Sequence, residues 1–518
     1  MLKAENHSLK MENYNLRSNP ICSSCDGSSD KLRLENSRLR QELDLLRSIA
    51  SLFDSPPSPQ DTSFYFSETD NNNVTLISEE EKAAAMDLAV SCVQELEKMC
   101  ETIEPLWNKK MSVSLNEEEY KKMFQWPPMD DGRFRREASR ANEVVLMNSI
   151  TLVNTFLDAD KWSEMFCPIV SRAKTIQIIS SGVSGASGSL LLMYAELQGL
   201  SPMVPTREGY FLRYAEQKAE ESKWMIVDFP IKKASATAAT DQYRRKPSGC
   251  IIQDIPNGYS QVTWVEHVEV EEKHVLHEVV REYVRSGVAF GAERWLSVLK
   301  RQCERMASLM ATDITDLGVI PSVDARRNLM RLSQTMVKSF CYGQAFSEST
   351  MDAVRVTRTR RKVCGGVVLC AVSTKFLPFS HHQVFDLLRD DHVLSQVANN
   401  SPDNEEMMLQ ETCTDNSGGL VVYSTVDFKA AMNGEDTSSI PILPLGFSIV
   451  PVNPPEGISV YSPSCLLTVG IQFLASNVAT ARLELSNVND RIFTTLKLIT
   501  SSLESSGSSA VPKQEISW

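Results

Sequence analysis

The sequence lacks both a long hydrophobic run and a surplus of positive charge. Its 518 residues contain no uninterrupted apolar stretch of the length that crosses a membrane, about 18 residues, and no apolar signal segment at the start. We therefore expect a protein that is neither secreted nor membrane-spanning. Acidic residues outnumber basic ones by 66 to 53, which gives a formal net charge of −13. This sign is opposite to the basic footprint that binds a phosphate backbone.

Sequence motifs for catalysis are also missing. There is no nucleophile elbow and no phosphate-binding lysine motif, and the glycine-rich stretch 182–188 is predicted to connect two strands, which makes a poor phosphate loop. The tightest histidine groups are His267, His274 and His277, and the pair His381 and His382, without the carboxylate or cysteine spacing of a metal or triad site. We therefore expect no enzyme, no catalytic residue, no metal site and no catalytic cofactor.

The N-terminal region contains two leucine heptad blocks. With leucine at position d, position a is mostly asparagine, position g is glutamate and position e is lysine or arginine, a pattern typical of a parallel two-stranded coiled coil. The alternative is a pair of amphipathic helices that fold back on the chain's own globular part. The residues predicted to form the dimer contact are Leu2, Asn6, Leu9, Asn13, Leu16, Leu32, Asn36, Leu39, Leu43 and Leu46.

A cysteine-containing loop separates the two blocks. The spacing from Leu16 to Leu32 is not a multiple of seven, and the loop holds Cys22 and Cys25. Two thiolates are fewer than the four ligands of a structural zinc site. Three interpretations stay open: inert thiols, a redox linkage between subunits, or zinc shared by two subunits. The twelve cysteines of the chain have no regular spacing, which favours a reducing compartment and mostly buried thiols.

The order of zipper, cysteine loop and second zipper resembles that of plant class IV homeodomain–leucine zipper transcription factors. Further resemblance is carried by the stretches Glu104–Trp107, Phe134–Ser139, Pro205–Glu208, Arg245–Gly249, Pro256–Ser260, Val262–Val268, Gln302–Arg305 and Leu409–Asp415. In that family a START domain, which is a lipid-binding module, and a START-associated domain follow the zipper. The resemblance implies a nuclear regulator of transcription that forms homodimers or heterodimers with class IV relatives. It also implies a small hydrophobic ligand, such as a sterol, ceramide, fatty acid or phospholipid.

The family also has a homeodomain before the zipper, and this sequence shows no such DNA-reading segment. We therefore expect the chain to reach DNA only through a homeodomain-bearing partner. Two alternatives stay open: a truncated form of a full DNA-binding factor, and a cytoplasmic lipid-binding or transfer module. The basic runs Arg244–Lys246 and Arg358–Lys362 are interpreted as solvated strand ends or hairpins, with a nuclear import signal as the alternative.

The expected fold class is α+β, in several units. Composition and pattern predict a zipper region at 1–49, a linker at 50–80, a START domain at 81–312, a second linker at 313–324 and a START-associated domain at 325–518. In the START region, periodicity predicts helices at 81–104, 137–157 and 290–312, and strands at 175–180, 189–198, 209–217, 223–230, 249–255 and 261–271. The resemblance implies a helix-grip fold, in which a curved antiparallel sheet and a long C-terminal helix enclose a lipid tunnel.

The predicted strand 261–271 carries one carboxylate, Glu266, in the middle of an apolar face. A buried carboxylate needs a partner, and Arg213 is the candidate. Alternatively, Glu266 faces solvent while Thr263, Val265 and His267 point inward. The candidate tunnel-lining residues are Phe211, Arg213, Val262, Trp264, Glu266, Val268, Trp295, Leu299 and Met306.

The C-terminal region repeats this pattern in shortened form. Its expected elements are helices at 325–343 and 485–499 and strands at 363–374, 407–412, 419–428, 445–452 and 464–474. The polar stretch 396–406 stands where the family has a further strand pair. Missing strands would leave unpaired edges in the sheet, so we expect a domain that is either only partly competent or re-paired.

Overall fold

A computed structural model describes residues 76–507, except 109–113, 125–133, 183–185, 232–242, 272–276, 312–319, 321, 344–353, 364–365, 391–405, 434–441 and 453–462. The predicted zipper, its loop with Cys22 and Cys25, and nearly all of the first linker lie outside the described residues. Among the described helices, none combines the length and apolar character that a membrane crossing needs.

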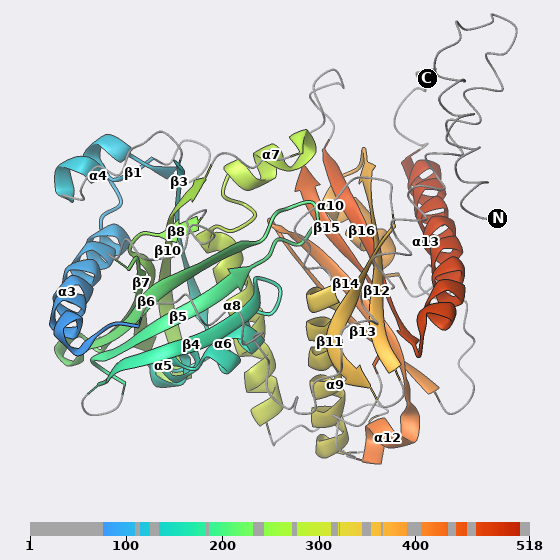
Figure 1. Ribbon diagram of the computed structural model, residues 1–518, viewed down its shortest axis with the longest axis horizontal. Coiled ribbons are helices and arrows are strands. Elements are labelled where there is room, and N and C mark those ends of the chain that lie inside the picture. Colours follow the sequence, from blue (N-terminus) through green and yellow to red (C-terminus); the bar gives the residue numbers. More distant parts are fainter. Residues whose placement is uncertain are drawn as a thin grey trace, which may run out of the picture. The chain divides into compact units, whose positions relative to one another are not determined.

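The first described domain is built on a curved antiparallel sheet (Figure 1). Seven of its strands follow the order β3-β10-β9-β7-β6-β5-β4, and β8 pairs separately with β10. The strands are β3 (Phe134–Val145), β4 (Val170–Ser181), β5 (Ser189–Leu197), β6 (Arg207–Lys218), β7 (Lys223–Phe229), β8 (Tyr243–Arg245), β9 (Ser248–Ile255) and β10 (Tyr259–Glu271). Two very short strands, β1 (Trp107–Asn108) and β2 (Ser114–Leu115), pair with each other, and α4 (Glu117–Met123) follows them.

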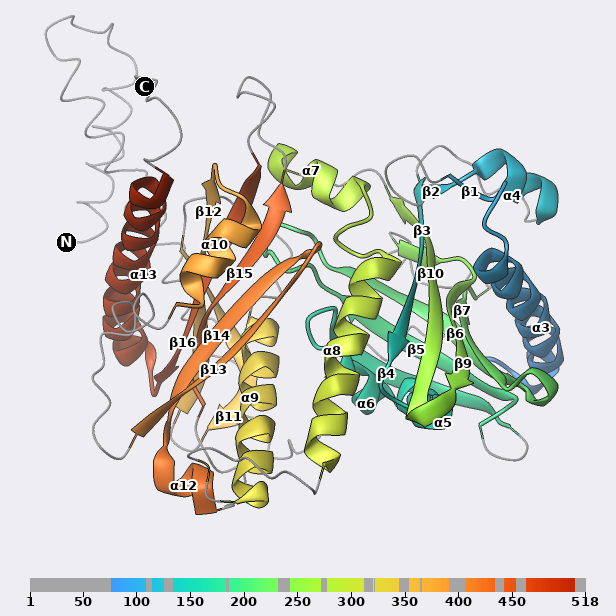
Figure 2. The same cartoon turned by 180° about the vertical axis from the view of Figure 1, so that it is seen from behind.

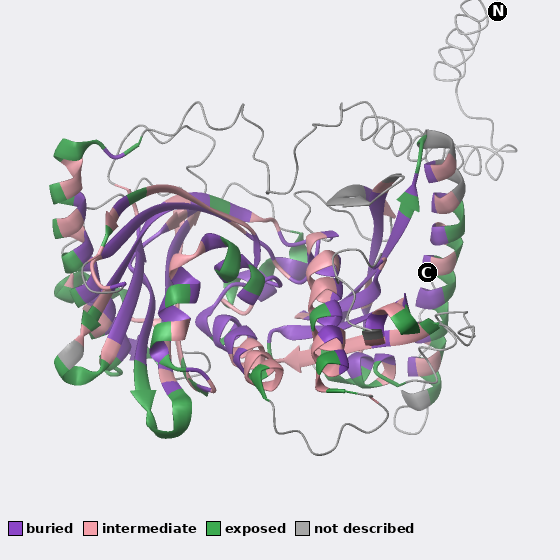
Figure 3. Ribbon diagram, turned by 90° about the horizontal axis from the view of Figure 1, so that it is seen from below, coloured by how far each residue is buried: buried purple, intermediate pink, exposed green. Residues whose placement is uncertain are grey.

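Helices cover both faces of this sheet, as Figure 1 and Figure 2 show from opposite sides. The helix α3 (Glu79–Glu101) packs on one face, and α8 (Ala292–Met310) lies against the other together with α5 (Ser149–Leu157) and α6 (Ala159–Met165). Successive residues of β10 therefore enter two different cores. Trp264 packs on the α8 side, and Val265 packs on the α3 side. Because both faces of the sheet are covered, the strands are mostly buried along their length, and exposed residues lie at the ends of the hairpins (Figure 3).

The strand β3 corrects one prediction. The sequence predicts a helix over 137–157, but residues Phe134–Val145 form a strand, and only Ser149–Leu157 is helical. Although Phe134–Val145 contains good helix formers, the whole segment pairs with β10, from Phe134 opposite Glu271 to Val145 opposite Ser260. This long antiparallel ladder outweighs the weak local preference for helix.

The second described domain is a six-stranded antiparallel sheet with the order β11-β12-β16-β15-β14-β13. The helix α9 (Val323–Gly343) lies on one face, and α13 (Val478–Gly507) lies on the other (Figure 1). The strands are β11 (Arg355–Val363), β12 (Gly366–Leu377), β13 (Glu406–Asp415), β14 (Gly418–Asp427), β15 (Leu445–Val452) and β16 (Ser464–Ala475). Of the two alternatives for this domain, the structure shows the re-paired sheet, because β13 pairs along its full length with β14, and β14 pairs with β15. In the described part of this sheet, only β11 and β13 are edge strands.

Three further α-helices and two short 3-10 helices, Ala219–Glu221 and Pro256–Gly258, belong to the described structure. The α-helices are α7 (Glu278–Arg285), which precedes α8, and α10 (His381–Leu388) and α12 (Phe428–Asn433) in the second domain. The strand β11 and the helices α7 and α10 are among the elements that the sequence did not predict. The basic run Arg358–Lys362 lies in β11, close to its hairpin with β12.

His267, in β10, is fully buried on the α3 side of the sheet. Its ring lies edge-on to Tyr120, with the centroids 4.9 Å apart, and neither ring nitrogen has a hydrogen-bond partner among the described residues. Burial lowers the pKa of His267 to about 3, and the charges of Lys246 and Arg136 act in the same direction. In the unfolded chain the pKa is about 6.5. Between these values the unfolded state binds more protons, so stability falls as the pH falls below about 6.5.

We predict that His267→Phe removes part of the acid sensitivity of the first domain. A neutral ring keeps the edge-on contact but has no proton to gain. Below about pH 6.5, the free energy of unfolding should therefore fall less steeply with decreasing pH in the variant than in the wild type. The difference in slope should be up to about 1.4 kcal/mol per pH unit. Urea unfolding at about pH 6.5 and about pH 4.5 measures this difference, with His382→Gln at an exposed histidine as the control. An equal loss of stability in wild type and His267→Phe would contradict the assignment.

Candidate functional site in the first domain

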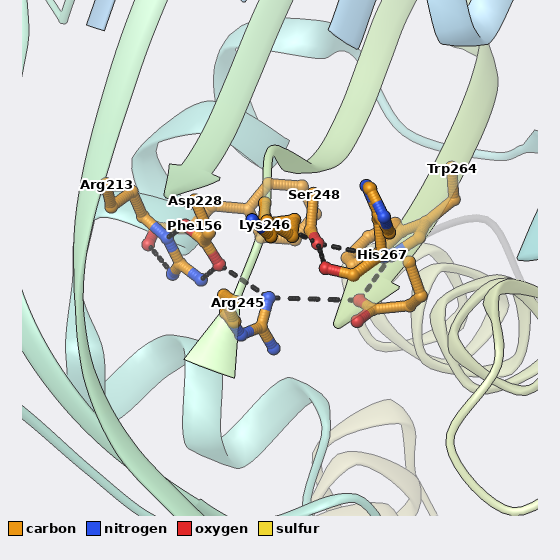
Figure 4. Close-up of polar contacts among 9 residues, drawn as sticks. Phe156, Arg213, Asp228, Arg245, Lys246, Ser248, Trp264 and His267 are labelled. Carbon is orange, nitrogen blue, oxygen red and sulfur yellow. Dashed lines mark hydrogen bonds and ion pairs between the residues drawn. The ribbon is translucent and has the colours of Figure 1, made fainter. Parts of the chain in front are cut away.

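Asp228 lies at the end of the apolar strand β7 and is only 2% exposed. Arg213 of β6 donates to it through both Nε and Nη2, at 2.7 and 2.8 Å. Arg245 of β8 donates to Asp228 Oδ2 at 2.8 Å (Figure 4). One carboxylate therefore connects two buried arginines from two other strands.

Glu266 of β10 extends this group on the far side of Arg245. Its Oε1 lies 3.8 Å from Arg245 Nη1 and accepts a hydrogen bond of 2.9 Å from the indole N–H of Trp264. Burial raises the pKa of the Glu266 carboxyl, and the charge of Arg245 and the Trp264 hydrogen bond oppose this. We call Arg213, Asp228, Arg245 and Glu266 the charge network. With all four groups ionised, two positive and two negative charges cancel.

The charge network corrects the predicted partner of Glu266. The direct pair between Arg213 and Glu266 is not formed, because Arg213 is committed to Asp228. Arg213 and Glu266 are linked only through Asp228 and Arg245. The interpretation in which Glu266 faces solvent is also wrong, since its exposure is 5% and it lies on the α8 side of the sheet, like its neighbours Trp264 and Val268.

An aromatic cluster packs directly against the charge network. The Arg213 guanidinium lies 4.1 Å from the centroid of the Trp162 ring and donates to the backbone oxygen of Phe156 at 2.7 Å. Trp295 of α8 stacks on Trp264 at 5.1 Å and on Trp162 at 5.9 Å. The space between α8 and the middle of the sheet is therefore largely filled by aromatic side chains.

A cavity of about 210 Å³ lies beside this cluster. Its wall includes Glu266 and Val268 from β10, and Arg207, which donates two hydrogen bonds of 2.9 and 2.8 Å to Glu137 and stacks over Phe290 at 4.0 Å. Tyr243 also lines the cavity. Its buried hydroxyl interacts with the Arg245 guanidinium, which uses only part of the hydrogen-bonding capacity of a phenol. The remaining capacity suits a bound polar group.

The predicted lining residues meet in one place, but few of them reach the cavity. The apolar ones share a single buried core with α8, and Met306 is partly buried at its edge. Only Glu266 and Val268 line the cavity itself. Contact of these residues with a lipid stays a prediction. The core members are Phe211, Val262, Trp264, Val268, Trp295 and Leu299.

Comparison with known proteins places this site in a family context. Residues 87–305 match the START domain, and residues 322–398 and 392–505 match the PDF2-like C-terminal domain. Homeobox-leucine zipper protein HDG4 of Arabidopsis thaliana is 63% identical over 97% of this chain and 77% of its own length. The chain belongs to the class IV homeobox–leucine zipper family. HDG5 of Arabidopsis thaliana is 53% identical, over 100% of this chain and 79% of its own length. ROC3 of Oryza sativa subsp. japonica is 38% identical, over 98% and 76%.

The resemblance drawn from the sequence is thus confirmed for the family, and the α+β START fold agrees with it. In this START domain, Glu266 of the charge network lies on the face of the sheet that α8 covers. The relatives HDG4 and HDG5 are named homeobox–leucine zipper proteins. Among the described residues of this family member, no group of three His, Cys, Asp or Glu side chains is placed to hold a metal ion.

Several residues of the site have no place in the sequence prediction. Asp228 has the same signature as Glu266, a lone carboxylate in an apolar strand, and could have been found in the same way. Arg245 belongs to the basic run Arg244–Lys246, for which a solvated strand end is expected. That expectation is wrong for two of its residues, because Arg245 and Lys246 are 3% and 5% exposed and pair with Asp228 and Glu269. Their burial also argues against this run as an import signal.

We predict that Asp228→Asn severely destabilises the START domain. The amide keeps the shape of the side chain but leaves two buried arginines with a single carboxylate. Removing one partner of a buried ion pair costs about 3–5 kcal/mol. Urea unfolding followed by tryptophan fluorescence measures the change. Glu79→Gln, which breaks the exposed pair with Lys82, is the matched control and should change stability by less than about 1 kcal/mol. A similar small effect for Asp228→Asn would contradict a structural role of the charge network.

Proposed function

We propose that this chain is a lipid-binding regulator of transcription that acts in the nucleus. Membership of the homeobox–leucine zipper family supports the regulatory role, and the START domain supports a small hydrophobic ligand. In this proposal the START domain binds the ligand, and the zipper pairs two chains.

The observation that carries the ligand proposal is the cavity next to the charge network. Its wall combines the Tyr243 hydroxyl and charged groups with the apolar side chains of Leu197, Val268 and Phe290. This combination fits an amphiphile whose polar end lies between Tyr243 and Glu266. The volume of about 210 Å³ is below the roughly 300–1,000 Å³ of a typical ligand pocket, so it accommodates a polar end only. The apolar part of the ligand then displaces side chains between α8 and the sheet, where the flexible Met306 is the easiest to move.

We predict opposite effects of two substitutions at Val268, which lines the cavity and is 4% exposed. Val268→Phe fills the cavity and should abolish the gain in melting temperature that a bound lipid produces. Val268→Ala enlarges it and should retain most of that gain. In the wild type, a ligand at 100 times its Kd stabilises the folded state by about 2.7 kcal/mol, which is easily measured as a shift in melting temperature. Sterols, ceramides, fatty acids and phospholipids are tested in parallel. An equal shift in wild type and Val268→Phe would place the ligand elsewhere.

We propose that residues 1–49 form the parallel dimer contact, on the basis of their heptad pattern. The double variant Leu9→Lys, Leu39→Lys should lower the dimer fraction, because it places charges face to face in two leucine layers. Met11→Lys, Gln41→Lys adds the same charge at outward heptad positions and is the matched control. Sedimentation analysis of the three full-length proteins measures the outcome. A dimer that survives in Leu9→Lys, Leu39→Lys would assign dimerisation to another part of the chain.

We also propose that DNA contact is supplied by a homeodomain-bearing class IV relative in a mixed dimer. The formal net charge of the 518 residues is −13, which disfavours direct binding to a phosphate backbone and supports DNA contact through the partner. A mobility-shift assay with the chain, the relative and their mixture tests it. A mixed complex on DNA supports the proposal, and specific binding by the chain alone would refute it.

A further inference from the structure

A large cavity lies between the START domain and the C-terminal domain. Its volume is about 620 Å³, and its wall is formed mainly by α8 of the START domain and by α9 and β13 of the C-terminal domain. The helices α8 and α9 lie side by side in both Figure 1 and Figure 2. This volume is within the roughly 300–1,000 Å³ that is typical of ligand pockets. Among the described residues, none lines both this cavity and the cavity of about 210 Å³ in the START domain.

One end of the interdomain cavity carries two arginines. Arg305 of α8 donates to the backbone oxygen of Met330 in α9 at 3.2 Å and pairs with Glu411 of β13. Arg326 of α9 donates to the backbone oxygen of Ser308 in α8 at 2.7 Å, and also to its hydroxyl. A guanidinium has five N–H donors, so both arginines keep donors beyond these contacts. This end of the cavity can therefore bind a further hydrogen-bond acceptor.

The other end of the cavity is apolar. The contacts of Arg305 and Arg326 place the end of α8 beside the start of α9, so the two helices run antiparallel. Val298 of α8 and Val337 of α9 also line the cavity, and each lies about 10 Å or more from those contacts along its helix. Leu420 of β14 lies near Val298, since both also line a small neighbouring pocket. The cavity thus has a polar end and an apolar end.

The charge of Arg326 favours an anion at the polar end. Glu411 balances Arg305, whereas Arg326 makes its hydrogen bonds to Ser308 and pairs with no carboxylate among the described residues. A partly buried arginine of this kind is the usual partner of a carboxylate or a phosphate, because its planar donors match the oxygens of these groups.

We propose that the interdomain cavity is a second ligand site, which binds a single-chain amphiphile with an anionic head group. The head group accepts hydrogen bonds from Arg326 and Arg305, and the alkyl chain lies between α8 and α9 towards Val298 and Val337. Such a ligand contacts both domains at once. The proposal does not depend on the START ligand, because the two cavities have separate walls.

The ion pair between Arg305 and Glu411 allows a test with opposite expected signs. Arg305→Gln removes a donor to the head group, so it should weaken binding about tenfold or more. Glu411→Gln breaks the same ion pair but removes a competitor for Arg305, so it should tighten binding. If the pair served only to hold the two domains together, both variants would weaken binding alike.

Titration calorimetry of the full chain measures these effects. The probes are dodecanoate and dodecyl phosphate, each below its micelle-forming concentration, and dodecylammonium as the same chain with the opposite charge. All variants are made in the Val268→Phe chain, whose START cavity is filled. We expect both anions to bind and dodecylammonium to bind much more weakly, and the tighter anion identifies the head group as a carboxylate or a phosphate. Absence of binding by both anions, or equal binding of all three probes, would overturn the proposal.

Two further pairs of variants locate the site. Arg326→Gln should weaken binding of the anions, whereas Arg327→Gln, at the next residue and outside the cavity wall, should not. Ser333→Trp fills the cavity from α9 and should abolish binding, and Arg331→Trp on the exposed side of α9 is its control. Melting temperatures without ligand establish that each variant folds. Unchanged binding in folded Arg326→Gln and Ser333→Trp, or weaker binding in Glu411→Gln, would refute the site.

Discussion

The buried Asp228 carboxylate, shared by two arginines, is the interaction on which the START domain depends. It joins β6, β7 and β8, and through Arg245 it reaches Glu266 on β10. Desolvating these charges is costly, and each member remains tolerable only while its partners are in place. The charge network therefore fixes the relative positions of strands that are far apart in the sequence. It also places a polar surface inside an otherwise apolar fold.

The helix α8 connects this interior to the rest of the described structure. Trp295 on its inner side stacks on the aromatic cluster, whereas Arg301 and Arg305 pair with Asp415 and Glu411 of the C-terminal domain. A ligand that displaces side chains between α8 and the sheet would therefore act on the same helix that holds the second domain.

Much of this architecture can be predicted from the sequence, and the failures have physical causes. Strands such as β10 and β15 are predictable, because alternation or a continuous apolar run marks them. Burial of Glu266 is one of two alternatives that the sequence leaves open, and its partner is not predicted. Arg245 belongs to a run for which a solvated strand end is expected, and only the pairing of β8 with β10 brings it close to Glu266. Tertiary pairing also decides β3, whose composition favours helix. The START identity is predictable because long stretches of the sequence resemble the family, and residues 87–305 match the START domain.

Native mass spectrometry of the full chain, purified without denaturant and then incubated with sterol, ceramide, fatty acid or phospholipid, is the most direct test of the central claim. We expect one bound molecule per chain from at least one of these classes, and we expect unfolding to release it. A chain that carries no bound mass with any of them would show that its own side chains fill the START interior, and the lipid-binding proposal would be wrong.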